Sequence, residues 1–185
     1  GRRPAALTEH IIAAETDLAV VDAGGHEPSI GWHGNAVLVK QGTVIKDLHA
    51  LHLPGLEPRG ALVVDMVVRG CGLRVVAVHL GFVRRFRRRQ LANIRSRLLA
   101  MEDCPTIILG DFNEWSNTGG FEPLTGFQVH AAGSTFHAAR HVAALDRIAT
   151  NQNVRVLDMH VVETRLTRVA SDHLPLRATI ELVDR

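Results

Sequence analysis

The sequence contains no tyrosine, and Phe and Trp together make up only 4% of its 185 residues. Its two cysteines, Cys71 and Cys104, are too few for a disulfide-stabilised scaffold and do not form a CxxC pair. We therefore expect a reducing compartment, the cytoplasm. No apolar run approaches the roughly 20 residues that a membrane-spanning helix needs. These absences exclude disulfide-rich scaffolds and helical membrane proteins.

A large excess of one charge is also missing. Lys and Arg number 21 against 19 Asp and Glu, a net charge of +2 that does not by itself indicate nucleic-acid binding. Neither GxGxxG nor GxxxxGK[ST] occurs, so we expect no nucleotide-binding loop of those kinds. Hydrophobic residues make up 46% of the sequence and charged residues 22%. That composition and length are typical of one globular domain, which we place at residues 1–185.

Helix-like and strand-like segments alternate along the chain. Helical spacing of apolar residues predicts helices over 4–15 and 82–101. Apolar runs predict strands over 18–21, 35–39, 43–45, 62–68, 73–79, 106–109, 142–148, 154–159 and 174–182. The turn at Lys40-Gln41-Gly42 predicts a hairpin between 35–39 and 43–45, and Gly70 and Gly72 predict a tight connection before 73–79. This order indicates a two-layer or four-layer α/β sandwich rather than a parallel Rossmann sheet.

Polar residues stand at the ends of the apolar strands, where a rigid scaffold can direct them into one cleft. They are His79, Asp111 with Asn113, Asp146, and Asp172 with His173. Carboxylate and amide oxygens suit Mg²⁺ or Mn²⁺, and a carboxylate beside a histidine orients the ring. A metal near histidine can activate water and stabilise charge on phosphorus. The set therefore indicates metal-assisted phosphoester hydrolysis.

Each residue also has a purely structural interpretation. Asp111 and Asp172 suit turns, Asn113 suits a helix N-cap, and His173 suits the core. These readings stay open for single residues. Together they are the weaker explanation, because complementary residue types recur at strand ends.

Six short sequence motifs in a fixed order carry a family resemblance. They are Gly34-Asn35-Ala36-Val37-Leu38, Glu57-Pro58-Arg59-Gly60-Ala61-Leu62, Val78-His79-Leu80-Gly81, Gly110-Asp111-Phe112-Asn113, Leu145-Asp146-Arg147-Ile148 and Ser171-Asp172-His173-Leu174-Pro175. Through them the chain resembles the endonuclease/exonuclease/phosphatase superfamily. The resemblance implies a DNase I-like four-layer α/β/β/α sandwich with its site at one edge of the two sheets.

The same resemblance implies a role for each site residue. His79 would contact the scissile phosphate, Asp111 would position or deprotonate the attacking water, and Asn113 would help to hold both. His173, oriented by Asp146, would stabilise the pentacovalent phosphoryl state. The metal, Mg²⁺ or Mn²⁺, would lie at Asp172 and Asp111. Arg59 and Trp115 are candidates for substrate contact.

One part of the chain departs from the family pattern. Members begin with an Asn-bearing strand, and their second strand ends in a metal-binding Glu. Here the second strand corresponds to Asp17–Ala23, so Ala23 stands in the place of that Glu, and Asp22 or Glu27 would have to replace it. We therefore expect the domain to be N-terminally incomplete, without its first strand, and the chain to be weakly active or inactive.

Two further patterns leave alternatives open. The run Arg84-Arg85-Phe86-Arg87-Arg88-Arg89 suits a phosphate backbone or a lipid surface, or simply a solvated helix face. His137 and His141 have the spacing of a helical zinc pair but lack the Glu of HExxH.

The resulting hypothesis is a divalent-metal-dependent phosphoesterase that hydrolyses a phosphodiester or phosphomonoester by in-line attack of water. We expect a monomer with no evident protein partner. The phosphate-ester substrate is a small molecule, a phospholipid head group or a nucleic acid, and we favour a small or lipid phosphodiester. The alternative is a non-catalytic binding module that kept the fold and lost its metal site.

Overall fold

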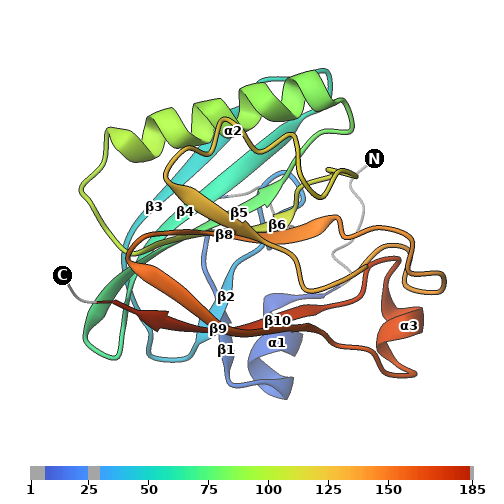
Figure 1. Ribbon diagram of the computed structural model, residues 1–185. Coiled ribbons are helices and arrows are strands. Elements are labelled where there is room, and N and C mark those ends of the chain that lie inside the picture. The colour runs from blue at the N-terminus through green and yellow to red at the C-terminus, as the bar shows by residue number, and fades with distance from the viewer. Residues whose placement is uncertain (1–6, 25–29, 184–185) are drawn as a thin grey trace.

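The computed structural model describes residues 7–24 and 30–183. These residues form four layers (Figure 1). Helix α2 (Arg84–Leu99) covers one face of a six-stranded sheet, and two pairs of strands face the other side with helix α1 (Glu9–Glu15) beyond them. This arrangement confirms the expected α/β/β/α sandwich.

The six-stranded sheet holds most of the site. Its strand order is β3 (Val44–Leu53), β4 (Arg59–Val68), β5 (Cys71–His79), β6 (Thr106–Asp111), β8 (Asp146–Asn151) and β7 (Phe127–His130). All neighbours are antiparallel except β5 and β6, which α2 connects as a crossover. Because β5 and β6 are parallel, both end at the same edge of the sheet.

The other strand layer consists of two separate pairs in the described residues. Strand β1 (Leu18–Val20) pairs with β2 (Leu38–Lys40), and β9 (Val154–Val161) pairs with β10 (Leu176–Leu182). The short helix α3 (Thr167–Ala170) lies between β9 and β10 in the chain.

The expected hairpin between 35–39 and 43–45 is wrong. Its turn exists, since the Thr43 N–H donates to the Lys40 carbonyl at 3.0 Å. The strands on either side diverge, however, because β2 joins β1 in one sheet while Val44 begins β3 in the other. A local turn signal cannot show that the chain changes layer there.

Both faces of the large sheet are packed. Leu91 and Ile94 of α2 are buried against one face together with Val76 and Ile108. The opposite face buries a second apolar cluster that includes Val64. Alternate residues of each strand therefore point to different cores, which explains the nearly continuous apolar runs of β4 and β5.

Several element boundaries differ from the expectations. The first helix begins at Glu9, where the Thr8 side chain accepts from the Ile11 N–H, and the expected start at 4–6 lies outside the described residues. Strand β8 begins at Asp146, not at residue 142, because Ala143 instead bridges to Phe136. Strand β7 was not expected. Across the two described ranges, no helix is long and apolar enough to cross a membrane.

Candidate active site

Three of the expected site residues lie side by side on neighbouring strands. His79 is in register with Asp111 across the parallel β5–β6 pair, and Asp111 is in register with Asp146 across the antiparallel β6–β8 pair. Since residues in register on one edge share a height along the sheet, the backbone alone brings the imidazole and both carboxylates together.

His173 completes this group from the segment that precedes β10. Its Nδ1 lies 2.7 Å from Asp146 Oδ2, which is the hydrogen bond expected from the sequence. A bridge between Phe136 and His173, with the Leu174 N–H donating to the Thr135 carbonyl at 2.9 Å, holds the segment in place. The ring of His173 is therefore fixed by Asp146 on one nitrogen and free to direct the other into the site.

The Asp111 carboxylate lies between the two imidazoles. Its Oδ2 is 3.6 Å from Nε2 of His79 and 3.8 Å from Nε2 of His173. Its Oδ1 accepts from the Asn113 N–H at 2.7 Å, so that oxygen is held by the backbone. One carboxylate oxygen thus faces two ring nitrogens, an arrangement suited to holding water and a phosphoryl group.

Burial and charge set different pKa values for these groups. Burial raises the pKa of Asp111, and the nearby Asp146 charge adds to this against the hydrogen bond from Asn113. Burial lowers the pKa of His79, and the charge of Arg59 lowers it further. Burial also disfavours the charged form of His173, but its hydrogen bond to Asp146 and the nearby carboxylate charges, that of Asp146 first, together raise its pKa. The two histidines therefore differ, with His173 the better cation.

Asn113 is a buried loop residue rather than a helix N-cap. Its backbone has φ of +50°, a left-handed conformation that Asn tolerates better than most residues. Its side-chain Nδ2 donates to the Leu80 carbonyl at 2.9 Å. Asn113 therefore joins the loop after β6 to the loop after β5.

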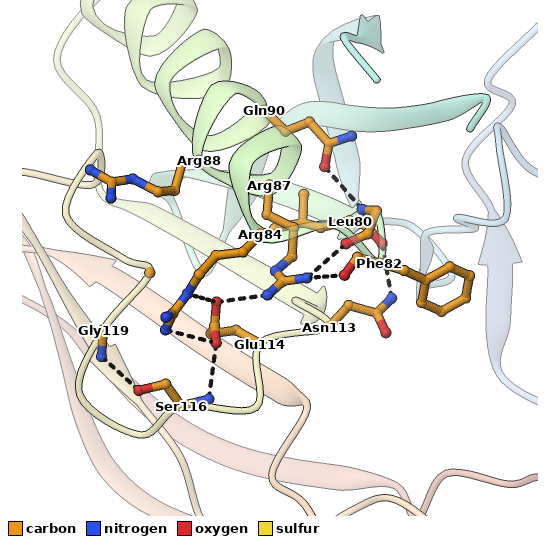
Figure 2. A network of polar contacts seen from close by, with 12 residues as sticks. Leu80, Phe82, Arg84, Arg87, Arg88, Gln90, Asn113, Glu114, Ser116 and Gly119 are labelled. Carbon is orange, nitrogen blue, oxygen red and sulfur yellow. Dashed lines mark hydrogen bonds and ion pairs between the residues drawn. The ribbon is translucent and has the colours of Figure 1, made fainter. Parts of the chain in front are cut away.

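Glu114 and Arg87 form a second connection between these loops that the sequence analysis missed (Figure 2). Arg87 Nη2 donates to Glu114 Oε2 at 2.8 Å, while its Nη1 donates to the carbonyls of Phe82 at 2.6 Å and Gly81 at 3.2 Å. Arg84 binds the same carboxylate with two donors. The buried Glu114 is therefore fully engaged as an anion.

Gln90 adds a third contact from the same helix. Its Oε1 accepts from the Gly81 N–H at 2.9 Å, and its Nε2 donates to the Pro54 carbonyl at 3.0 Å. The signal for this network was in the helical spacing, because positions 87 and 90 fall on the stripe that carries Leu91 and Ile94. Polar residues on a buried stripe need partners, and here the partners are the site loops.

The arginine run is thus largely committed to contacts within the chain. Arg84 and Arg87 bind Glu114, Arg85 and Arg89 lie over the ring of Phe86, and Arg88 is 3.7 Å from Glu122. The arginine run is therefore neither a continuous phosphate-binding surface nor a plain solvated helix face.

Arg59 and Trp115 border the site differently. Arg59 binds Glu57 through Nε and Nη2 and lies 5.2 Å from the ring centroid of Phe82, close enough for its charge to act on His79. The side chain of Trp115 is 61% exposed, so it does not belong to the core. Its ring is 6.0 Å from that of Phe136, which in turn is 5.1 Å from His173.

The described residues do not complete a metal site. Asp172 is exposed and accepts from Ser171 Oγ at 3.3 Å, and within 7–24 and 30–183 no group of three or more His, Cys, Asp or Glu side chains is arranged to hold a metal ion. At the end of β1, Asp22 accepts from the Gly24 N–H and Ala23 offers no ligand atom. Glu27 lies outside the described residues. The metal role of Asp111 and Asp172 stays a prediction.

His137 and His141, whose spacing in the sequence resembles a helical zinc pair, make other contacts. His141 Nε2 lies 2.9 Å from the Ala138 carbonyl and 3.6 Å from Glu163, and His137 Nδ1 accepts from the Ala139 N–H. Both residues lie in a loop rather than a helix. Nothing here supports zinc binding by this pair.

Comparison with known proteins agrees with this fold. Two Bacteroides structures each give a TM-score of 0.76: the endonuclease/exonuclease/phosphatase from Bacteroides vulgatus, with 17% identity over 93% of this chain and 79% of that one, and the mannosyl-6-phosphatase from Bacteroides thetaiotaomicron, with 14% identity over 94% and 80%. The human Nocturnin catalytic domain with bound sulfate gives 0.66, with 17% identity over 95% and 84%. No curated protein matches the sequence. The model of the Endonuclease/Exonuclease/phosphatase family matches residues 5–173, and the chain belongs to that family.

Proposed function

We propose that the chain hydrolyses a phosphate ester by in-line attack of water at the site formed by His79, Asp111, Asp146 and His173. The observation that carries the proposal is the position of Asp111 Oδ2 between the two imidazole Nε2 atoms. Membership of the family and the fold shared with a named phosphatase support the same class of reaction.

Each site residue has a role that its charge determines. Asp111, held at Oδ1 by the backbone, offers Oδ2 to the attacking water and accepts its proton. His173, whose pKa is raised with the help of Asp146, is the better cation of the two histidines and stabilises the negative charge that develops on the phosphoryl oxygens. His79, whose pKa is lowered, serves as a neutral N–H donor to the same oxygens.

Mg²⁺ or Mn²⁺ remains part of the proposal as an expected cofactor. When bound, such an ion would supply further charge stabilisation, and Asp111 with Asp172 would be the anchoring residues. The described donors fall short of a complete site, so no step above depends on the ion.

Hydrolysis of bis-p-nitrophenyl phosphate tests the proposal. The assay is run with EDTA, with Mg²⁺ and with Mn²⁺, on the unmodified chain and on His173→Ala. We expect turnover that falls about 100-fold or more in the variant, since the loss of one group that stabilises transition-state charge costs about that much. His10→Ala, on the exposed face of α1, is the matched control and should keep full activity.

A different outcome would favour the binding-module alternative. If no added metal gives turnover while a phosphate ester still binds and shifts the His173 resonances, the site recognises phosphate without hydrolysing it. That result would contradict the proposed reaction and leave the geometry of the site unchanged.

A further inference from the structure

Large apolar side chains are exposed on segments near the site. Each lies on a loop or short helix that adjoins a site residue, and each is more than half exposed: Leu56, Phe82, Trp115, Val142, Leu166 and Val169. We call these six residues the apolar rim. Isolated exposed apolar residues are ordinary, but a set gathered around one site marks an interaction surface.

Contacts within the chain show that the rim borders the site from two sides. On one side, Phe82 lies under Arg59, and its N–H donates to Glu57 Oε1 at 3.4 Å, one residue from Leu56. On the other, Trp115 contacts Phe136, which contacts His173. Figure 1 shows α3 on the same side of the molecule as the loop between β7 and β8.

The remaining rim residues are Val142, on the loop that joins β7 to β8, and Leu166 and Val169, on the segment between β9 and β10. The Ala138 N–H donates to the Asp172 carbonyl at 2.7 Å, which ties this loop to the segment after α3. His141, next to Val142, is 3.6 Å from Glu163, and Glu163 binds Arg168 between Leu166 and Val169. Val142, Leu166 and Val169 therefore lie on segments that these contacts join.

The charge on the rim loops is mainly positive. Their glutamates are already bound within the chain, Glu57 by Arg59, Glu114 by Arg84 and Arg87, and Glu163 by Arg168. The exposed arginines Arg85, Arg140 and Arg165 lie on the same or adjoining segments, against an exposed Asp172. An apolar surface bordered by arginines is complementary to an anionic bilayer, whose headgroups attract the cations while the interface accepts apolar side chains.

The residue types favour lipid over single-stranded nucleic acid. Bases stack on aromatic rings, and Phe82 and Trp115 could serve that purpose. Four of the six rim residues are aliphatic, however, and these gain nothing from stacking but do gain from insertion at a lipid interface.

We propose that the apolar rim docks the chain on an anionic lipid surface, so that the phosphate ester entering the site is presented by a membrane interface. The identity of the substrate in this inference rests on the proposed function, whereas the docking itself does not.

Sedimentation with vesicles tests the docking without any turnover. Vesicles of phosphatidylcholine mixed with phosphatidylglycerol are compared with phosphatidylcholine alone, at low and high salt. We expect binding to the mixed vesicles that weakens with salt, because screening reduces the arginine contribution. Trp115 emission should shift to shorter wavelength on binding, as its exposed ring leaves water.

Two paired variants distinguish the rim from general hydrophobicity. Phe82→Ser with Trp115→Ser, and Leu166→Ser with Val169→Ser, should each weaken vesicle binding about tenfold or more, since two interfacial anchors are removed. Leu99→Ser with Leu157→Ser is the matched control, because both residues are well exposed away from the rim loops. All the changes are at exposed positions, and circular dichroism verifies the fold.

Three results would overturn the proposal. These are absence of binding to mixed vesicles, an equal loss in the control, and binding to a single-stranded oligonucleotide but not to vesicles. Vesicle binding without hydrolysis of bis-p-nitrophenyl phosphate would refute the proposed function and leave the docking surface standing.

Discussion

Arg87 and Glu114 form an almost completely buried ion pair, with side chains 6% and 5% exposed and Nη2 2.8 Å from Oε2. The pair lies between the loop that follows His79 and the loop that follows Asp111 and carries Asn113. A buried pair of this kind adds little net stability over apolar packing, but it fixes the geometry of what it joins. It therefore positions site residues without being placed to touch a substrate.

Arg87→Met should destabilise the chain by about 3–5 kcal/mol, because it leaves the Glu114 carboxylate buried without its main partner. Urea unfolding measures the change. Arg88→Met, one position along α2 with an exposed side chain, should change stability by less than about 0.5 kcal/mol. Equal effects of the two changes would show that the buried pair has no special role.

Asp146→Asn should shift the alkaline limb of the pH–rate profile to lower pH. Asp146 raises the pKa of His173 against the effect of burial, so its loss lets burial lower that pKa. The required imidazolium then disappears at a lower pH as pH rises. The acid limb reports Asp111, whose pKa is raised by burial, and the loss of the nearby charge should move it to lower pH as well.

The same change has a readout that does not depend on turnover. A group whose pKa is raised on folding stabilises the fold below its unfolded pKa, and this contribution is lost as pH rises through the folded value. The unmodified chain should therefore lose His173-dependent stability on going from acid to alkaline pH, whereas Asp146→Asn should lose less. An unchanged NMR titration of His173 in the variant would contradict this account.

Gly110→Ala should be among the most damaging single-methyl changes in the chain. Its φ is +137°, and an added Cβ would lie 2.0 Å from the Val78 carbonyl oxygen, a backbone atom of the neighbouring strand. We expect a loss of about 2–4 kcal/mol from strain and displacement of Asp111. Gly70→Ala, also at positive φ but with open space around it, should cost only about 1 kcal/mol. Thermal unfolding compares the two.

Metal binding should be weak and should depend on Asp111. Because the described donors form no cluster of three, we expect calorimetry to give a low affinity for Mg²⁺ and Mn²⁺, and Asp111→Asn to lower it about tenfold or more. Asp158→Asn, an exposed carboxylate beside His160 on β9, is the control and should bind as before. Tight binding by the unmodified chain would indicate a ligand that the described residues do not reveal.

The sequence predicted those parts of the site that lie on strands. His79, Asp111 and Asp146 each end or begin an apolar run, so the hydrophobic pattern predicted that they lie at the ends of strands. His173 was predicted from the sequence motifs of the family. The contact between Asp146 and His173 was expected because the family resemblance assigns one to the other. Strands β4, β5 and β6 were predicted for the same reason, since their apolar residues are dense and their turns contain glycine.

Features that depend on tertiary contacts were not predicted. The turn at Gly42 indicated a hairpin, but only the competing partners of β2 and β3 decide that the chain changes sheet there. The arginine run suggested a charged surface, since nothing in the local pattern shows that Glu114, 27 residues beyond Arg87 in the chain, meets it. Long-range partners of this kind cannot be recovered from spacing within one element.

The register of His79, Asp111 and Asp146 also determines where this chain can change length. One residue inserted in β6 would move Asp111 by about 3.3 Å and turn its side chain to the other face of the sheet. Insertions in the loop between Asn117 and Gly126, or between Val162 and Leu166, would leave the three positions aligned. Variation in length among proteins that share this site is therefore expected in the loops that border it, and not in the strands that carry the three residues.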